Sequence, residues 1–321
     1  MSTLTLAKVY EDLQIPLALE LLDTDVDLNV QVTARDVHRP GMALMGFTAN
    51  FLPGRLQVMG ESEMAYLASL SPAEQATAFA RVLELDAPAC FISQSLDAPA
   101  TILNFVNEHR VPLFRSSLPA VDFITELSHY LEHQFAPRTD LHGTLVDVYG
   151  VGMLFTGRSG IGKSECALDL VERGHRLVAD DIVEVTKTGE DIIVGSHRKI
   201  LRHNIEIRGV GVIDVQSIYG VRAIRMQKRI ELEVRLQDWD DREDYERLGL
   251  EQQTTAILGV SIPSVVVPLF PGKNITVISE VIALDFMLKF YGYDAAQVLN
   301  QRILESMGQS EQIRYFQRDK E

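Results

Sequence analysis

The order of apolar and polar positions predicts alternating strands and helices in the first half of the chain. Short apolar runs typical of buried strands occur between segments with helical periodicity. The strands are predicted at 17–22, 89–92 and 111–114, and the helices at 62–70, 72–85, 99–108 and 121–135. Ser71 is placed to cap the start of the second helix. This pattern indicates an N-terminal α/β domain over residues 1–135.

The second half continues the alternation and closes with two helical patterns. Strands are predicted at 144–149, 151–156, 175–179, 182–185, 192–194, 210–215, 230–235 and 265–268, and helices at 163–173, 280–291 and 295–307. Gly174 follows the first of these helices, where a left-handed residue commonly ends a helix. Residues 136–140 are a polar break that contains Pro137, and they are interpreted as a linker. A second α/β domain is therefore predicted over 136–321.

The composition indicates a folded protein, and several sequence features indicate its cellular compartment. The chain has 321 residues, of which 46% are hydrophobic and 23% charged, values typical of two ordinary folded domains. The N-terminus lacks the basic and apolar regions of a signal peptide, and no run reaches 18 apolar residues. Cys90 and Cys166 are far apart and are expected to be free thiols in a reducing compartment. We therefore expect a cytoplasmic protein with no membrane association.

Charge excludes one class of partner and marks one segment. The formal net charge of −15 argues against general affinity for nucleic acid or anionic lipid. Residues 197–229, however, hold eight Lys or Arg against Glu206 and Asp214. This segment fits either an anion site or a solvated basic surface. The first half holds no recognisable phosphate loop, metal cluster or nucleophile–base pair, so a regulatory or assembly role is predicted for it.

A phosphate-binding motif lies between a predicted strand and a predicted helix. Residues 157–164 read GRSGIGKS and fit the pattern G-x-x-x-x-G-K-[ST]. The glycines allow backbone N–H groups to face phosphate oxygens, and the helix start adds its positive dipole end. Lys163 can reach the β- and γ-phosphates, and the Ser164 hydroxyl suits Mg²⁺. The predicted nucleotide-binding residues are Gly157, Arg158, Ser159, Gly160, Ile161, Gly162, Lys163 and Ser164.

Two adjacent carboxylates follow soon after this motif. Asp180 and Asp181 end the predicted strand 175–179. By themselves such residues are often a turn or a helix cap. Beside a phosphate loop, one carboxylate could help to hold a metal, and the other could accept the proton of an attacking hydroxyl, as in kinases. The sequence leaves open which residue has which role.

The second half resembles the HPr kinase/phosphorylase family, bacterial enzymes that phosphorylate a serine of the phosphocarrier protein HPr. Five stretches carry the resemblance in order and spacing, and LHG at 141–143 matches upstream of them. They are GRSGIGKSE (157–165), GHRLVADD (174–181), IEIRGVGVIDV (205–215), ERLGL (246–250) and VVPLFPGKN (266–274). The first half is similar more loosely, through RPGMALMGF (39–47) and VPLFRSS (111–117). The combination is much more specific than a phosphate loop alone.

The resemblance implies roles for several residues. His142 and Arg247 correspond to active-site residues, and Glu206 corresponds to a metal ligand that acts with Ser164. Asp181 corresponds to the residue that accepts a proton in phosphorylation and donates it in the reverse reaction, with Asp180 beside it. Without the family, His142 would be interpreted as a turn residue, Glu206 as a strand-edge acid and Arg247 as a solvated side chain.

The segment 268–273 corresponds to one associated with dephosphorylation. Here it reads PLFPGK, whereas relatives commonly carry the more basic PVRPGRN. This difference bears on the balance of the reverse reaction. The resemblance further implies Mg²⁺ as cofactor, ATP or pyrophosphate as donor, a homohexamer, and a P-loop kinase fold like that of phosphoenolpyruvate carboxykinase. A small-molecule kinase, a carboxykinase-like enzyme and a non-catalytic ATP sensor are the alternatives.

Overall fold

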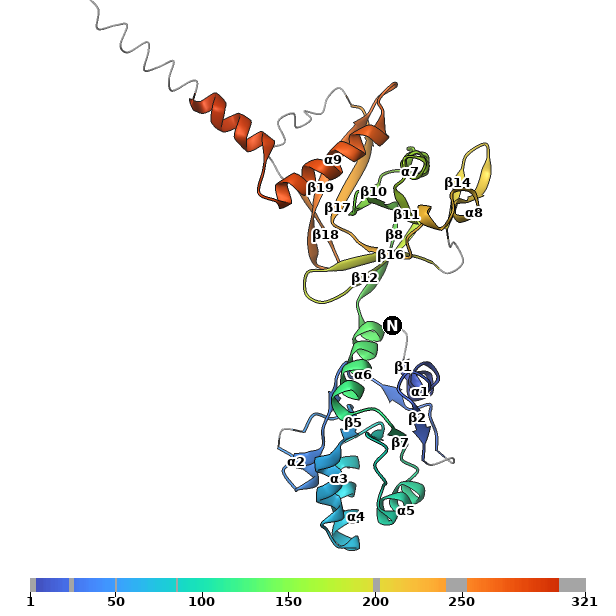
Figure 1. Ribbon diagram of the computed structural model, residues 1–321, viewed down its shortest axis with the longest axis vertical. Coiled ribbons are helices and arrows are strands. Elements are labelled where there is room, and N and C mark those ends of the chain that lie inside the picture. The colour runs from blue at the N-terminus through green and yellow to red at the C-terminus, as the bar shows by residue number, and fades with distance from the viewer. Residues whose placement is uncertain are drawn as a thin grey trace, which may run out of the picture. The chain divides into compact units, whose positions relative to one another are not determined.

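The computed structural model describes residues 4–22, 26–49, 51–84, 86–198, 203–240 and 253–305. The chain divides into two compact units, residues 1–136 and 137–321. Both units combine helices with β-sheets (Figure 1). No helix in the described ranges is both long enough and apolar enough to cross a membrane. The α/β class predicted for each half is confirmed.

The first unit is built on a five-stranded sheet with strand order β2-β7-β6-β5-β4. Strands β4 to β7 run parallel, and β2 pairs antiparallel with β7. The strands of the unit are β1 (Leu4–Thr5), β2 (Leu19–Leu21), β3 (Gln31–Val32), β4 (Val37–His38), β5 (Leu56–Met59), β6 (Cys90–Ile92) and β7 (Leu113–Ser116). Its helices are α1 (Leu6–Leu13), α2 (Gly41–Leu44), α3 (Glu61–Ala68), α4 (Pro72–Leu83), α5 (Ala100–His109) and α6 (Ala120–Phe135).

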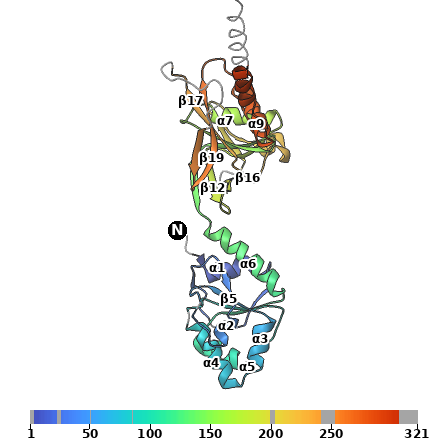
Figure 2. The same ribbon diagram turned by 90° about the vertical axis from the view of Figure 1, so that its left-hand side faces the viewer.

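Helices cover both faces of this sheet (Figure 2). Phe91 and Phe114 point to the face covered by α1 and α6. Cys90, Ile92 and Leu113 point to the opposite face, where α2 to α5 pack. Successive strand residues alternate between faces, so a sheet buried on both sides needs apolar residues at nearly every position. This explains why its strands appear in the sequence as short, mainly apolar runs.

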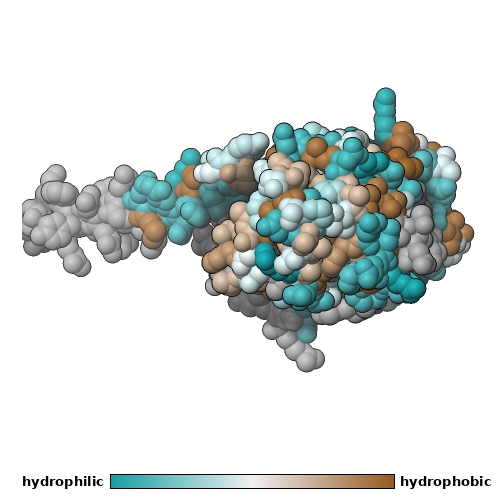
Figure 3. All heavy atoms as spheres, turned by 90° about the horizontal axis from the view of Figure 1, so that it is seen from below, coloured by the Kyte–Doolittle hydropathy of each residue, from teal (hydrophilic) through white to brown (hydrophobic). Residues whose placement is uncertain are grey.

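The end of the first unit seen in Figure 3 lies over α3, α4 and α5. Hydrophilic and hydrophobic residues are intermingled there, and neither kind forms an extended single face in the part that is coloured.

Ser71 and Glu74 make the expected cap at the start of α4, because the Glu74 carboxylate accepts bonds from the Ser71 N–H (2.9 Å) and hydroxyl (2.7 Å). The two cysteines, Cys90 and Cys166, are free, as predicted, and both are buried.

The second unit contains a six-stranded sheet of order β11-β9-β10-β17-β19-β18 and a four-stranded sheet of order β16-β13-β12-β8. Its first strands and helix are β8 (Arg138–His142), β9 (Thr144–Val148), β10 (Val151–Thr156), α7 (Lys163–Glu172), β11 (Arg176–Ala179), β12 (Ile182–Lys187) and β13 (Ile193–His197). Then come β14 (Asn204–Ile207), β15 (Gly211–Asp214), α8 (Val215–Tyr219), β16 (Gln227–Arg229), β17 (Leu232–Asp238), β18 (Gln253–Ile257), β19 (Val260–Leu269) and α9 (Ile275–Phe290).

Several predicted boundaries in the second unit differ from the structure. Part of the expected linker is strand β8, which pairs with β12 so that His142 lies opposite Ile182. Helix α9 begins at Ile275 rather than at 280, because the Asn274 side chain caps it by accepting from the Val277 N–H. Strand β19 begins at Val260, five residues before the predicted strand. The predicted left-handed residue after α7 is confirmed, since Gly174 has φ of +99°.

The large sheet of the second unit has a core on each face. Helices α7 and α9 lie side by side on one face (Figure 1, Figure 2). Val183, Val185 and Ile193 of the small sheet pack with Leu145 and Leu154 on the other face. The loop between β10 and α7 therefore starts from a strand that is buried on both sides, which gives the loop a rigid base.

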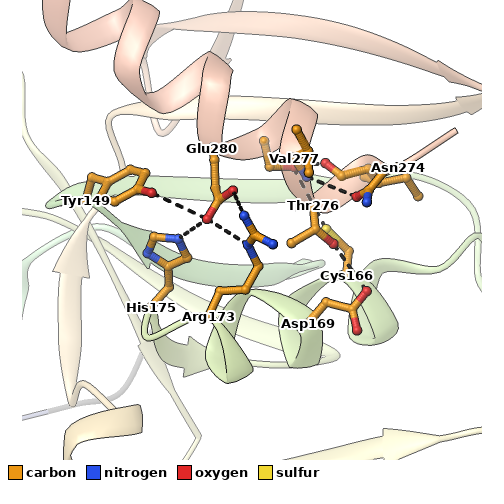
Figure 4. Close-up of polar contacts among 11 residues, drawn as sticks. Tyr149, Cys166, Asp169, Arg173, His175, Asn274, Thr276, Val277 and Glu280 are labelled. Carbon is orange, nitrogen blue, oxygen red and sulfur yellow. Dashed lines mark hydrogen bonds and ion pairs between the residues drawn. The ribbon is translucent and has the colours of Figure 1, made fainter.

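A partly buried ion-pair cluster fastens α9 to the end of α7 (Figure 4). The Glu280 carboxylate of α9 accepts from the Arg173 guanidinium at 2.9 and 2.6 Å. It also lies 3.1 Å from His175 Nε2, and the Tyr149 hydroxyl donates to it at 3.4 Å. The Arg173 guanidinium, acting against the opposing effect of burial, holds the pKa of Glu280 at about 2.

Glu280→Gln is expected to lower the melting temperature of the second unit by about 3 °C at pH 7, equivalent to about 1 kcal/mol, because the variant removes the ion pair with Arg173 and water can hydrate the half-exposed guanidinium. The lowered pKa means that the stabilisation is present above the unfolded value near 4.5 and is lost as the pH falls towards 2. The difference in melting temperature between the variant and the wild type should therefore shrink as the pH falls from 4.5 to 3. Glu190→Gln, in the exposed turn between β12 and β13, is the matched control.

Candidate active site

The loop between β10 and α7 depends on glycine at three positions. Gly157, Gly160 and Gly162 have φ of +140°, +75° and +105°, a region that residues with a Cβ rarely adopt. A Cβ at Gly157 would also lie 2.5 Å from the carbonyl oxygen of Leu236. Such a run of turns makes a concave surface of backbone N–H groups at the start of a helix, which suits phosphate oxygens.

Lys163, the first residue of α7, is folded back onto this loop. Its side chain is buried, and its ammonium donates to the carbonyls of Gly157 (3.0 Å) and Arg158 (3.1 Å). Burial lowers the pKa of Lys163, while the charges of Asp180 and Asp181 act in the opposite direction. The amine is thus held by loop oxygens within reach of any phosphate bound there.

Asp180 is buried and bonded to the start of α7. Its carboxylate accepts from the Thr144 hydroxyl at 2.6 Å and from the Ser164 hydroxyl at 3.0 and 2.9 Å. Burial raises the pKa of Asp180, and these hydroxyl bonds oppose the rise. The result is a carboxylate fixed against the loop serine, with its oxygens turned away from bulk water.

Asp181 has a different environment from its neighbour. Its side chain is 63% exposed, and its backbone is left-handed with φ of +65°. His142 Nδ1 lies 3.0 Å from the Asp181 carbonyl oxygen and 3.2 Å from its carboxylate. His142 Nε2 lies 3.5 Å from the Lys163 ammonium, so the tautomer with its proton on Nδ1 satisfies both contacts. His142 therefore connects the exposed carboxylate to the loop lysine.

These side chains line one open cavity of about 130 Å³. The structure brings together at its walls most of the residues that the sequence singled out. They are His142, Ser159, Gly160, Gly162, Lys163, Ser164, Asp180, Asp181 and Glu206, joined by Glu165 and Arg208. The cavity therefore combines phosphate-binding groups, two carboxylates in unlike environments and an acid from a separate hairpin.

Four predicted residues are not among these walls. Gly157 lies at the start of the loop, and the other three lie elsewhere or outside the described part. The Arg158 guanidinium, in the loop itself, pairs with the Asp238 carboxylate (Nη2 to Oδ1, 2.9 Å). Ile161 packs into the hydrophobic core under α7. Arg247 falls outside the residues that the structure describes. The predicted roles of all three stay predictions.

Arg208 was missed as an individual residue by sequence reasoning. It follows β14, and its guanidinium lies so close to Gly160 that a Cβ there would be 2.4 Å from Nη1. A cation held against the phosphate loop favours an anionic ligand. The signal in the sequence was the basic segment 197–229, but no residue within it stood out. Glu165, in the first turn of α7, was also missed.

The residues at the cavity fit a magnesium ion that is shared with a ligand. Ser164, Asp180 and Glu206 offer oxygen atoms only, which is the donor type that Mg²⁺ prefers. Within the described ranges, no group of three or more His, Cys, Asp or Glu could hold a metal by itself. Mg²⁺ in nucleotide sites is commonly bound by one or two protein groups together with phosphate oxygens. The donor set fits that arrangement.

Comparisons with known proteins identify close relatives along nearly the whole chain. The model described as "HPr Serine kinase N terminus" matches residues 4–131, and the one described as "HPr Serine kinase C-terminal domain" matches residues 133–303. The chain is 44% identical over 307 residues to the HPr kinase/phosphorylase of Chloroherpeton thalassium, covering 95% of this chain and 90% of the relative. It is 41% identical to the enzyme of the same name from Halalkalibacterium halodurans, covering 92% and 95%.

One solved structure, described as the HPr(Ser) kinase/phosphatase from Coxiella burnetii, is 30% identical in sequence. It covers 50% of this chain and 98% of its own, with a TM-score of 0.45.

Proposed function

Because this chain belongs to the HPr kinase/phosphorylase family, we propose that it phosphorylates a serine of the phosphocarrier protein HPr and also removes that phosphate by phosphorolysis. The donor is ATP or pyrophosphate, and the reaction takes place in the cytoplasm. The unlike environments of the two adjacent aspartates are the main support for this chemistry. Asp180 is buried against the loop serine, whereas Asp181 is open to an acceptor in the same cavity.

In the forward direction, the serine hydroxyl of HPr attacks the γ-phosphorus, and the bond from phosphorus to the oxygen bridging to the β-phosphate breaks. Asp181 takes the hydroxyl proton, since its exposed carboxylate is the one that an incoming protein can reach. Lys163 and the loop N–H groups stabilise the charge that develops on the phosphate oxygens. Arg208, lying against Gly160, contributes a second positive charge.

Asp180 and His142 act on these groups rather than on the substrate. Asp180 fixes the Ser164 hydroxyl, and His142 orients Asp181 through its Nδ1 contact. Ser164 and Glu206 would hold Mg²⁺ together with the donor's phosphates. When bound, the ion offsets negative charge on those phosphates.

The reverse reaction uses the same residues with the proton moving the other way. Inorganic phosphate attacks the phosphorus of phosphoserine, and the bond from phosphorus to the serine oxygen breaks. Protonated Asp181 gives its proton to that leaving oxygen, so the products are HPr and pyrophosphate. In this direction the loop residues hold inorganic phosphate instead of a nucleotide.

We also propose that the chain assembles as a homohexamer through α9, among other contacts. Four apolar residues lie along this helix at spacings of four, three and four residues, and they are 40–58% exposed: Val277, Val281, Leu284 and Leu288. A seam of this spacing on one face of a helix is the kind that packs against another helix. An exposed apolar stripe of this length favours a protein–protein contact.

The test of the function is incubation with purified HPr, Mg²⁺ and γ-labelled ATP, followed by addition of phosphate. We expect label on one HPr serine, mapped by mass spectrometry, and its later release as pyrophosphate. A label that stays on HPr after phosphate is added would contradict the reverse reaction. If HPr acquires no label although ATP binds, the substrate assignment is wrong.

A further inference from the structure

Two exposed aromatic rings lie at the ends of neighbouring strands in the second unit. Trp239 follows β17, Phe270 follows β19, and their side chains are 46% and 49% exposed. Their ring centres are 5.8 Å apart and their planes make an angle of 83°. Trp239 is the chain's single tryptophan. None of the steps described above uses either ring.

The strands that precede these rings end at the edge of the sheet from which the phosphate loop starts. Strand β17 runs parallel to β10, with Arg235 opposite Thr156, so the strand that precedes the loop and the strand that precedes Trp239 end at the same edge of the sheet. Asp238, next to Trp239, makes the bidentate pair with Arg158 of the loop. A ligand whose phosphates occupy the loop can therefore extend towards Trp239 without leaving the surface.

Phe270 serves as the support of the pair. The Lys273 ammonium lies 5.3 Å from its ring centre and donates to the Pro268 carbonyl at 2.6 Å, which closes the turn around Phe270. The edge-to-face geometry lets one ring brace the other without stacking on it. The indole thus offers a braced, half-exposed surface beside the phosphate loop.

We propose that Trp239, braced by Phe270, stacks on the purine base of the nucleotide donor whose phosphates bind at residues 157–164. Stacking uses the flat face that every base has. Removal of the aromatic residue from such a contact weakens binding by about tenfold or more. The inference rests on the proposed function only in taking a nucleotide as the donor. It adds a base subsite to a site that otherwise recognises phosphate alone.

The experiment compares ATP with inorganic triphosphate, which has the same phosphate chain but no base. Binding of each to the full chain in the presence of Mg²⁺ is measured by calorimetry, for wild type, Trp239→Ala and Trp239→Phe. We expect Trp239→Ala to weaken ATP binding by about tenfold or more and to leave triphosphate binding unchanged. Trp239→Phe should keep most of the wild-type affinity for ATP. Phe47→Ala, which removes a similarly exposed ring in the first unit, is the matched control and should change neither.

Three outcomes would overturn the base subsite. Equal weakening of ATP and triphosphate would assign Trp239 a structural role in the loop. Unchanged ATP binding in Trp239→Ala would place the base elsewhere. A wild type that binds triphosphate as tightly as ATP would show that no base is recognised. None of these measurements includes HPr, so failure of the HPr assignment would leave the result intact and would appear only in the labelling experiment.

Discussion

Asp181→Asn is expected to slow phosphoryl transfer to HPr about a hundredfold or more in both directions. The amide has nearly the shape of the carboxylate but cannot take the serine proton, and general-base catalysis typically contributes factors of this size. The side chain is largely exposed and contacts the half-exposed His142 ring, so the substitution should not disturb the fold. Initial rates with labelled ATP and HPr, and with phosphoserine-HPr and phosphate, measure the two directions.

The dissociation constant of ATP, measured for the same variant, separates a role in catalysis from a role in nucleotide binding. A base acts on the acceptor, so the dissociation constant of ATP should change little in Asp181→Asn. Asp97→Asn, an exposed carboxylate of the first unit that pairs with Arg115, is the control and should leave both rates unchanged. Asp181→Asn at the wild-type rate would assign proton transfer to another group.

The residues of the candidate site differ in how far the sequence could locate them. The phosphate loop is a local pattern, because its glycine conformations and helix start arise from eight consecutive residues. Arg208 reaches Gly160 across 48 positions of sequence, and nothing local distinguishes it from the other basic residues of 197–229. Pairing of distant segments, which decides such contacts, has no signature in a single sequence.

The difference between Asp180 and Asp181 also became visible only in three dimensions. Adjacent residues at the end of a strand point in different directions, and the sequence does not say which side is buried. Asp180 faces Thr144 on β9 and Ser164 on α7, whereas Asp181 has left-handed φ and turns towards solvent. The pair was recognised from sequence, but the distinct environments of its members depend on β9 and α7.

Strand β8 and the start of α9 could not be recognised from the pattern of hydrophobic residues. Residues Arg138–His142 include a single aliphatic residue, so the segment resembled a linker, yet it pairs along its whole length with β12. Helix α9 has apolar residues on its exposed face as well as on its buried face, so its periodicity is weak and its first turn was not recognised. Helices with one apolar face, such as α4 and α6, were located to within about two residues.

Lys163→Ala is expected to reduce phosphoryl transfer at least about a thousandfold, the largest effect predicted for any single residue here, because the lysine contacts the charge that develops during transfer. In the wild type the ammonium is held by the Gly157 and Arg158 carbonyls and lies beside His142, so its loss removes the one buried cation among the described walls of the cavity. The rate is measured with labelled ATP and HPr, and circular dichroism checks that the variant folds. Lys8→Ala, a half-exposed lysine of the first unit in ion pairs with Glu11 and Asp12, is the matched control and should keep the wild-type rate. If Lys163→Ala keeps transfer within tenfold of wild type while remaining folded, the phosphate loop is not where the chemistry takes place, and both the base subsite beside it and the role of Asp181 would lose their foundation.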